Sequence, residues 1–150
     1  MRIILVNPEI PPNTGSIGRL CAATSTQLVL VEPLGFSLED RYLKRAGLDY
    51  WPWIDVTVVD HYSKAFAATP GTNYLFTAHA TRPYTDAAFT DDDALVFGCE
   101  SVGLSPEALA AEPPEHHLRI PMDTTHVRSL NLAQCAALTL YEARRQLGRT

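Results

Sequence analysis

Short apolar runs rich in Val, Ile and Leu alternate along the chain with longer segments in which apolar residues recur every three or four positions. The short runs are typical of buried strands, and the longer segments are typical of helices that bury one side. The predicted strands are Ile3–Val6, Leu28–Val31, Val56–Val59, Tyr74–Ala78, Ala94–Gly98 and Leu118–Ile120. The predicted helices are Thr14–Ser25, Leu38–Arg45, His61–Ala68, Pro106–Ala111 and Ser129–Leu147. Strands separated by helices predict βαβ units, and therefore an α/β fold with a mainly parallel sheet and helices on both faces, in one domain over residues 1–150.

The segment after the first predicted strand, "IPPNTGSIGR", has the composition of a ligand-binding turn. Ligands of open α/β sheets bind outside the carboxyl ends of the strands, and this segment leaves such an end. Asn13 or Thr14 is expected to cap the next helix, whose free N–H groups would favour an anion. Gly18 costs that helix about 1 kcal/mol relative to alanine, which indicates close packing against another backbone.

Arg19 points away from the side of this helix that the apolar pattern buries. The residues predicted on the buried side are Ile17, Leu20, Cys21 and Thr24. Arg19 therefore faces a cleft, a partner or water, and a surface salt bridge is the structural alternative to a functional role.

The C-terminal helix has apolar or small residues all round its first three turns. They are Leu130, Leu132, Ala133, Cys135, Ala136, Ala137, Leu138 and Leu140. A helix without a polar face is covered on more than one side. In a chain of 150 residues, one side can rest on the sheet and another can meet a second subunit, so the pattern predicts a homodimer.

Composition narrows the compartment and the chemistry. No apolar run approaches the roughly 18 residues of a membrane span, and the N-terminus lacks the regions of a signal peptide, so a soluble, cytoplasmic protein is expected. Cys21, Cys99 and Cys135 are widely spaced and are interpreted as small buried hydrophobic residues. The histidines lack zinc-ligand spacing, which predicts no metal site.

The net charge of −5 argues against indiscriminate nucleic-acid binding but leaves room for local basic patches. Two clusters of basic residues occur, one made of Arg41, Lys44 and Arg45 and the other of Arg144, Arg145 and Arg149. Each can be a solvated helix face or a binding patch.

Three further stretches resemble sites: "LVFGCESVGLSPE" (95–107), "LRIPMDTTHVRSLNLA" (118–133) and "YLKRAGLDYW" (42–51). Taken singly, such strand–turn–helix patterns are weak, and none is a GxGxxG or Walker loop. Together and in order they are specific. With "NPEIPPNTGSIGRLCA" as the first motif, the chain resembles the SPOUT class of knotted RNA methyltransferases over nearly its whole length. The likeness is strongest to the family that 2'-O-methylates the wobble nucleotide of tRNA, known from tRNA-Leu isoacceptors.

The resemblance implies S-adenosylmethionine held in a trefoil knot near the C-terminus. By position, the family's cofactor contacts fall on Ala78, Gly98, Gly103, Ile120 and Ser129. Glycines permit close approach of a ligand to backbone, and apolar side chains can sandwich an adenine. The structural alternatives are core positions for Ala78 and Ile120, a plain turn for Gly98 and a helix cap for Ser129.

The resemblance also implies that Arg19 activates the ribose 2'-hydroxyl. A guanidinium is effectively never deprotonated in proteins, so binding a phosphate and stabilising developing negative charge match its chemistry better. Glu100 and Asn131 are expected to act in the catalytic site, and Ser129 to shape it through hydrogen bonds. Contacts to the RNA of the anticodon loop are expected from Arg41, Lys44, Arg45 and Arg128.

Two alternatives stay open. One is a 2'-O-methyltransferase of the same class acting on another RNA, such as ribosomal RNA. The other is a Rossmann-like nucleotide-binding module without catalysis, against which the missing glycine-rich fingerprint argues. Ala133 and Gln134 depart from the serine and asparagine of many relatives. The sequence does not select the tRNA isoacceptor or choose between cytidine and uridine.

Overall fold

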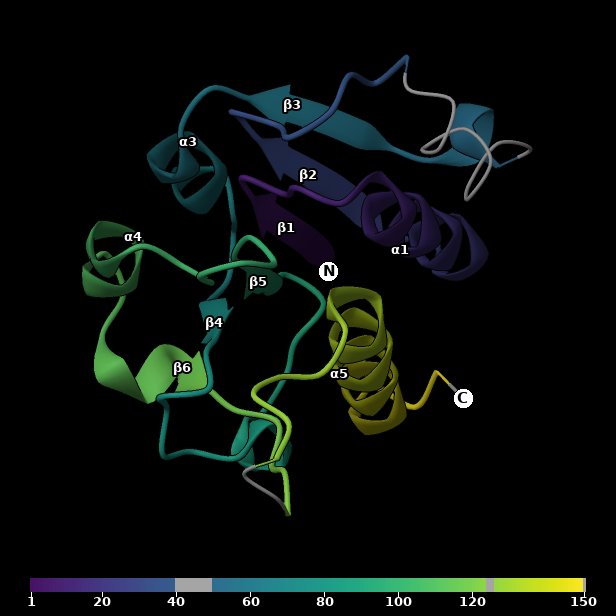
Figure 1. Cartoon of the computed structure of the whole chain (residues 1–150). Coiled ribbons are helices and arrows are strands. Elements are labelled where there is room, and N and C mark those ends of the chain that lie inside the picture. Colours follow the sequence, from purple (N-terminus) through teal and green to yellow (C-terminus); the bar gives the residue numbers. More distant parts are fainter. Residues whose placement is uncertain (40–49, 124–125, 150) are drawn as a thin grey trace.

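Within the part of the chain that the structure describes, six strands form one sheet in which every pairing is parallel (Figure 1). The computed structural model describes residues 1–39, 50–123 and 126–149. The strands are β1 (Arg2–Val6), β2 (Gln27–Val31), β3 (Val56–Val59), β4 (Asn73–Phe76), β5 (Ala94–Phe97) and β6 (His117–Leu118). Their order across the sheet is β3-β2-β1-β5-β4-β6. All six predicted strands are confirmed, with ends that differ by at most two residues.

Helices connect these strands, and four of the five predicted helices lie within the described residues. They are α1 (Pro11–Thr24), α3 (Tyr62–Ala67), α4 (Pro106–Ala110) and α5 (Leu132–Gln146). Short 3-10 turns add η1 (Trp51–Trp53), η2 (Tyr84–Asp86) and η3 (Pro114–His116). The predicted helix Leu38–Arg45 lies largely outside the described residues.

Two helix starts differ from the prediction for a physical reason. The first helix begins at Pro11 rather than Thr14, because proline suits the first turn of a helix, where its missing N–H is no loss. The last helix begins at Leu132 rather than Ser129, because the side chain of Asn131 caps it.

Apolar side chains fill both faces of the sheet. Along β1, Ile3 and Leu5 pack beneath α1 and α5, whereas Ile4 and Val6 pack on the side of α3 and α4. This alternation follows from the two-residue period of a strand. Helices therefore cover both faces, as the near-continuous apolar runs predicted.

The chain returns from the edge of the sheet to its middle after β6. Its last helix, α5, contacts α1 and β5, although β6 is separated from β5 by β4. The connecting segment runs beside the segment that follows β4 (Figure 1): Arg119 N donates to Arg82 O and Arg119 O accepts from Tyr84 N, both at 2.9 Å. Segments distant in sequence thus meet beyond the carboxyl ends of β4 and β6.

Candidate active site

The carboxylate of Glu100 joins the loop after β5 to the start of α1. Its Oε2 accepts from Glu9 N at 2.8 Å, and its Oε1 accepts from Ile10 N at 3.2 Å and from Asn13 Nδ2 at 3.1 Å. Hydrogen bonds to an ionised carboxylate are stronger than neutral ones. Glu100 therefore fixes the first motif against the second.

Asn131 ties the third motif to the same group. Its Nδ2 donates to Asn13 Oδ1 at 2.9 Å, while its Oδ1 accepts from Ala133 N at 2.9 Å and from Gln134 N at 3.3 Å. Asn13 is buried and uses both ends of its amide, one toward Glu100 and one toward Asn131. We call Asn13, Glu100 and Asn131 the carboxylate–amide network.

The prediction that Asn13 or Thr14 caps α1 and leaves free N–H groups for an anion is wrong. The cap position is Ile10, which makes no side-chain cap hydrogen bond. Pro11 and Pro12 have no N–H, and Asn13 N already donates to Ile10 O at 3.0 Å. Sequence reasoning missed Asn13 as a site residue, although its place in the first motif was a signal for it.

Gly98 and Gly103 close a tight loop directly after β5. Gly103 N donates to Cys99 O at 2.9 Å, and Gly103 has φ of 78°, which favours glycine. A Cβ added to Gly98 would lie 2.1 Å from the carbonyl carbon of Gly103, a distance that real Cβ atoms do not reach. The two glycines thus allow strand and loop backbone to touch.

A second contact holds this loop from the opposite direction. Glu9 accepts from Ser101 N at 2.9 Å and from Ser101 Oγ at 2.8 Å. Glu9 and Glu100 therefore each bind the backbone of the other's segment. No sequence pattern pointed to Glu9, because a glutamate in a turn has no distinguishing spacing.

Three predicted cofactor residues follow three adjacent strands. Ala78 comes after β4, Gly98 after β5 and Ile120 after β6. Thr77 N donates to Leu118 O at 2.9 Å, so the ends of β4 and β6 are in direct contact. Ala78 is exposed and Ile120 is half-buried, so neither is a fully buried core position.

Ser129 and Arg128 are exposed in the segment between β6 and α5. The alternative that Ser129 caps the last helix is wrong, since Asn131 is the cap. Both residues lie in the segment that leads into the carboxylate–amide network.

Arg19 lies on α1 but apart from that network. It follows Asn13 by six residues, which places it about 9 Å further along the helix and about 120° around it. It is exposed, as predicted, and its guanidinium carbon lies 4.9 Å from the centroid of the Tyr50 ring. Within the described ranges, Arg19 contacts this ring and forms no salt bridge.

Gly18 packs tightly as predicted, but against side chains and not against backbone. A Cβ there would lie 2.9 Å from Ile54 Cδ1 and 3.3 Å from Trp51 Cζ3. The segment from Trp51 to Ile54 thus docks onto α1 one residue before Arg19.

The structure describes only one of the two basic clusters. The cluster of Arg41, Lys44 and Arg45 lies outside the described residues. In the C-terminal cluster, Arg149 pairs with Asp91 at 2.7 Å, and Arg145 forms two hydrogen bonds to Glu142. Hydrogen bonds from Arg145 and Gln146 lower the pKa of Glu142 to about 2. Arg145 and Arg149 of that cluster are therefore engaged in intramolecular ion pairs.

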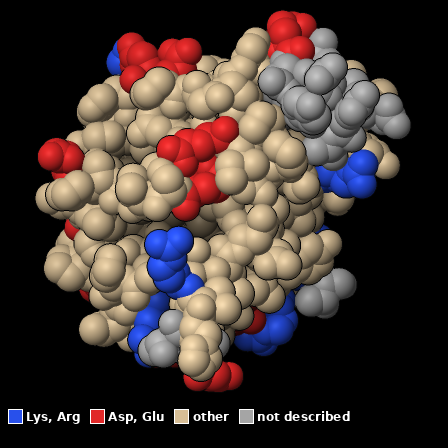
Figure 2. All heavy atoms as spheres, in the orientation of Figure 1, with Lys and Arg blue, Asp and Glu red and all other residues tan. Residues whose placement is uncertain are grey.

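The surface charge of one face is uneven. Figure 2 shows acidic side chains near its middle and others at its rim, and a Lys or Arg side chain just below the central ones. Within the described ranges there is no group of three or more His, Cys, Asp or Glu that could hold a metal. In the same ranges, no helix has the length and apolar composition that crossing a membrane requires.

The thiols match the cysteine interpretation in part. Cys21 is buried, and burial raises its pKa to about 12. Cys99 and Cys135 are half-buried, and Cys99 Sγ lies 3.4 Å from Gly103 O as a weak donor.

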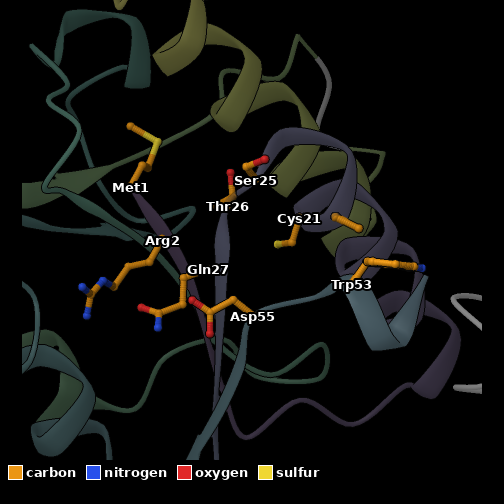
Figure 3. A pocket seen from close by; sticks show the side chains of 9 residues that line it. Met1, Arg2, Cys21, Ser25, Thr26, Gln27, Trp53 and Asp55 are labelled. Atoms are coloured by element: carbon orange, nitrogen blue, oxygen red, sulfur yellow. The ribbon is translucent and has the colours of Figure 1, made fainter.

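A cavity of about 420 Å³ lies at the opposite end of the sheet (Figure 3). It is lined by Met1, Arg2 and Gln27, near the starts of β1 and β2, and by Trp53 and Asp55. It contains none of the motif residues predicted to act in the site. The carboxyl edge of β4, β5 and β6 is therefore the better candidate.

The chain is similar to a known protein family and to named relatives. The family model described as "SpoU rRNA Methylase family" matches residues 1–141. The "tRNA (cytidine(34)-2'-O)-methyltransferase" of Methylovorus glucosotrophus is 48% identical over 145 residues, covering 96% of this chain and 94% of the relative.

Two solved structures are also similar to this chain. One described as "Structural insights into the 2-OH methylation of C/U34 on tRNA" has a TM-score of 0.91 at 43% identity, over 99% of this chain and 97% of the other. The SpoU methyltransferase AviRb from Streptomyces viridochromogenes, "in complex with the cofactor AdoMet", has a TM-score of 0.82 at 23% identity, over 100% of this chain and 61% of the other. At 23% identity, that likeness shows the shared fold alone.

Proposed function

The chain belongs to the SpoU rRNA methylase family, and from this membership we propose that it methylates the ribose 2'-hydroxyl of the wobble nucleotide, position 34, in the anticodon loop of tRNA. The observation that supports this most is the identity of 47–48%, over nearly the full length of the chain, to relatives named for that position. The substrate nucleotide is cytidine or uridine, and tRNA-Leu is the proposed substrate. The reaction takes place in the cytoplasm, where tRNA is modified.

The proposed methyl donor is S-adenosylmethionine, with which AviRb was solved. It supplies an electrophilic methyl group on a positively charged sulfur. The residues present fit it: Ala78, Gly98 and Ile120 follow three adjacent parallel strands, where backbone N–H and C=O groups can bind a ligand. Space is also open beside Gly103, where an added Cβ would meet no atom within 4 Å. Ser129 lies in the segment leading from β6 to α5.

The carboxylate–amide network orders the loops around this edge. Asn13 connects Glu100 to Asn131, and Asn131 also caps α5, so three segments are held in one arrangement before substrate arrives. Fixed groups cost no reorganisation during the reaction, which is how preorganisation lowers a barrier. We assign Glu100 and Asn131 to the catalytic site on this ground. The crossing of the segment after β6 beside the segment after β4 is the proposed trefoil knot.

Arg19 has the proposed role of binding an RNA phosphate and stabilising negative charge on the attacking 2'-oxygen. Its donors suit phosphate and oxyanion, and its permanent charge rules it out as the base. Arg128 is proposed as a second phosphate contact. Arg41, Lys44 and Arg45 are proposed contacts to the anticodon loop, which a chain of net charge −5 must bind through local patches.

Arg19→Ala is expected to abolish methyl transfer while leaving the affinity for S-adenosylmethionine largely intact. The reason is that Arg19 lies apart from the strand ends proposed to hold the cofactor. Steady-state turnover with tRNA and calorimetric titration with the cofactor measure the two quantities. Full turnover of the variant would refute the proposed role of Arg19.

A homodimer is proposed as the active form. Leu138 and Tyr141 on α5 are 45% and 52% exposed, and large apolar side chains gathered on one helix favour a partner. Arg19 lies apart from the carboxylate–amide network of its own chain. This position supports a dimer in which a second copy of the chain completes the site.

The test is transfer of a labelled methyl group to bulk tRNA, followed by mapping of the modified nucleoside. The proposal predicts 2'-O-methylcytidine or 2'-O-methyluridine at position 34. Label in ribosomal RNA instead would favour the alternative of a different RNA target. Absence of transfer to either RNA would favour the non-catalytic nucleotide-binding module.

A further inference from the structure

The turn from Tyr50 to Ile54 packs against α1 at Gly18. Ile54 is buried and its Cδ1 fills the space left by the missing side chain of Gly18, together with the ring of Trp51. The turn itself is closed by Trp53 N donating to Tyr50 O at 2.8 Å and Ile54 N donating to Trp51 O at 3.2 Å. Its position relative to α1 is therefore determined by packing and by its own hydrogen bonds.

Docking at Gly18 brings Tyr50 to the next residue of the helix. Arg19 directly follows Gly18, and its guanidinium carbon lies 4.9 Å from the centroid of the Tyr50 ring. That distance is within the range in which the negative face of an aromatic ring attracts a cation. The aromatic end of the stretch "RAGLDYW" thus has a defined neighbour.

We propose that Tyr50 is a positioning residue for Arg19, an inference that rests on the proposed role of Arg19 in methyl transfer. An arginine on an exposed helix surface has many rotamers, so an unsupported guanidinium would sample most of them. A ring whose centroid lies 4.9 Å from the guanidinium carbon restricts that sampling.

A ring also leaves the chemistry of the guanidinium free. The ring attracts the cation through its π electrons and carries no charge that would neutralise it, so the N–H donors that point away from the ring stay available. A carboxylate partner would instead occupy the donors and neutralise the charge. Tyr50 therefore holds Arg19 in place while keeping it available for phosphate and oxyanion.

Substitution at Tyr50 separates this role from simple packing. Tyr50→Phe keeps the ring and is expected to retain the kcat of the parent protein. Tyr50→Leu removes the ring and is expected to lower kcat for tRNA on the order of tenfold, the size of effect expected from lost cation–π attraction and misplacement of a catalytic group. Because Tyr50 is 42% exposed, neither change opens a cavity in the core.

The matched control is Trp53→Leu, which removes a nearby aromatic ring of the same turn that is 79% exposed. It is expected to leave kcat within about twofold of the parent, as an exposed ring without a role in positioning Arg19 should. The melting temperature and the affinity for S-adenosylmethionine are expected to be unchanged in all three variants. Equal kcat in Tyr50→Leu and the parent would overturn the proposal, as would equal losses in Tyr50→Leu and Trp53→Leu.

A spectroscopic readout tests the contact without any reaction. In the ¹H–¹⁵N spectrum of arginine side chains, the Nε–H signal of Arg19, assigned by its loss in Arg19→Ala, is expected to carry a ring-current shift. The shift persists in Tyr50→Phe and disappears in Tyr50→Leu. An unshifted signal in the parent overturns the contact itself. If the shift behaves as expected but Arg19→Ala keeps full turnover, the proposed role of Arg19 fails while the contact stands, so the two failures are distinguishable.

Discussion

At the scale of single residues, Asn13 illustrates how one amide can link three segments. Its Nδ2 and Oδ1 contact Glu100 and Asn131, which lie 87 and 118 positions away in the sequence. An asparagine with both ends engaged in a buried setting has one allowed orientation. These two hydrogen bonds hold the start of α1, the loop after β5 and the start of α5 together.

Gly98 offers the sharpest prediction at this scale. Gly98→Ala is expected to destabilise the protein by about 1–3 kcal/mol or more and to abolish cofactor binding, because its Cβ would lie 2.1 Å from the backbone of Gly103. Thermal unfolding and calorimetric titration measure the two effects.

Gly103→Ala is the matched control. An added Cβ at Gly103 meets no atom within 4 Å. The expected loss of stability therefore comes only from holding alanine at a φ of 78°, and it is about 1 kcal/mol. A Gly98→Ala protein as stable as Gly103→Ala would contradict the close approach described for this loop.

At the scale of elements, the start of α5 combines two functions in one side chain. Asn131 Oδ1 caps the helix, while Asn131 Nδ2 holds the helix start against Asn13. A cap alone is worth about 1 kcal/mol and would be supplied equally well by aspartate.

Asn131→Asp is therefore expected to keep the cap but lose activity. The new carboxylate can accept from the helix N–H groups, yet it has no donor for Asn13 Oδ1 and lies near Glu100. We expect a small change in the free energy of unfolding and a loss of turnover of tenfold or more, an order-of-magnitude expectation for a disturbed site. Stability by denaturant titration and kcat are the measurements. Wild-type kcat in Asn131→Asp would mean that the cap is the whole role of Asn131.

The elements that could be predicted from sequence are those with strong local patterns. Buried parallel strands such as β1 and β5 are near-continuous apolar runs, and Arg19 was correctly oriented from helical periodicity. The start of α1 was mispredicted because Asn13 and Thr14 have the composition of a cap, whereas the two prolines moved the helix start to Pro11.

The contacts within the site could not be predicted, because each joins residues far apart in sequence. Glu9 with Ser101, and Tyr50 with Arg19, follow from how the loops meet in the fold and have no local signature. The motifs indicated which loops form the candidate site, and the resemblance indicated the reaction proposed for it. The partners inside those loops came from three-dimensional packing.

At the scale of the whole molecule, the proposed dimer explains why α5 exposes large apolar side chains on one side. One side of this helix is fully buried at Ala136 and Leu140 on the core, whereas Leu138 and Tyr141 remain exposed. A homodimer interface of ordinary size would bury those two side chains.

Leu138→Lys combined with Tyr141→Lys, which places two like charges three residues apart on α5, is expected to give a monomer without methyltransferase activity. Burying two unpaired charges in an apolar interface costs several kcal/mol, enough to disrupt an interface of ordinary size. Analytical ultracentrifugation at micromolar concentration measures the mass. Val58→Lys, at an exposed apolar position of β3, is the control and should leave the dimer intact. A parent protein that sediments as a monomer would contradict the proposal.

The central claim is that the backbone at the carboxyl ends of β4, β5 and β6 binds a methyl donor. Isothermal titration of the purified protein with S-adenosylmethionine, and with S-adenosylhomocysteine as its demethylated product, measures this directly. The account predicts saturable binding of both at one site per chain, abolished in Gly98→Ala. Absence of heat from either ligand, with the parent protein folded, would contradict it.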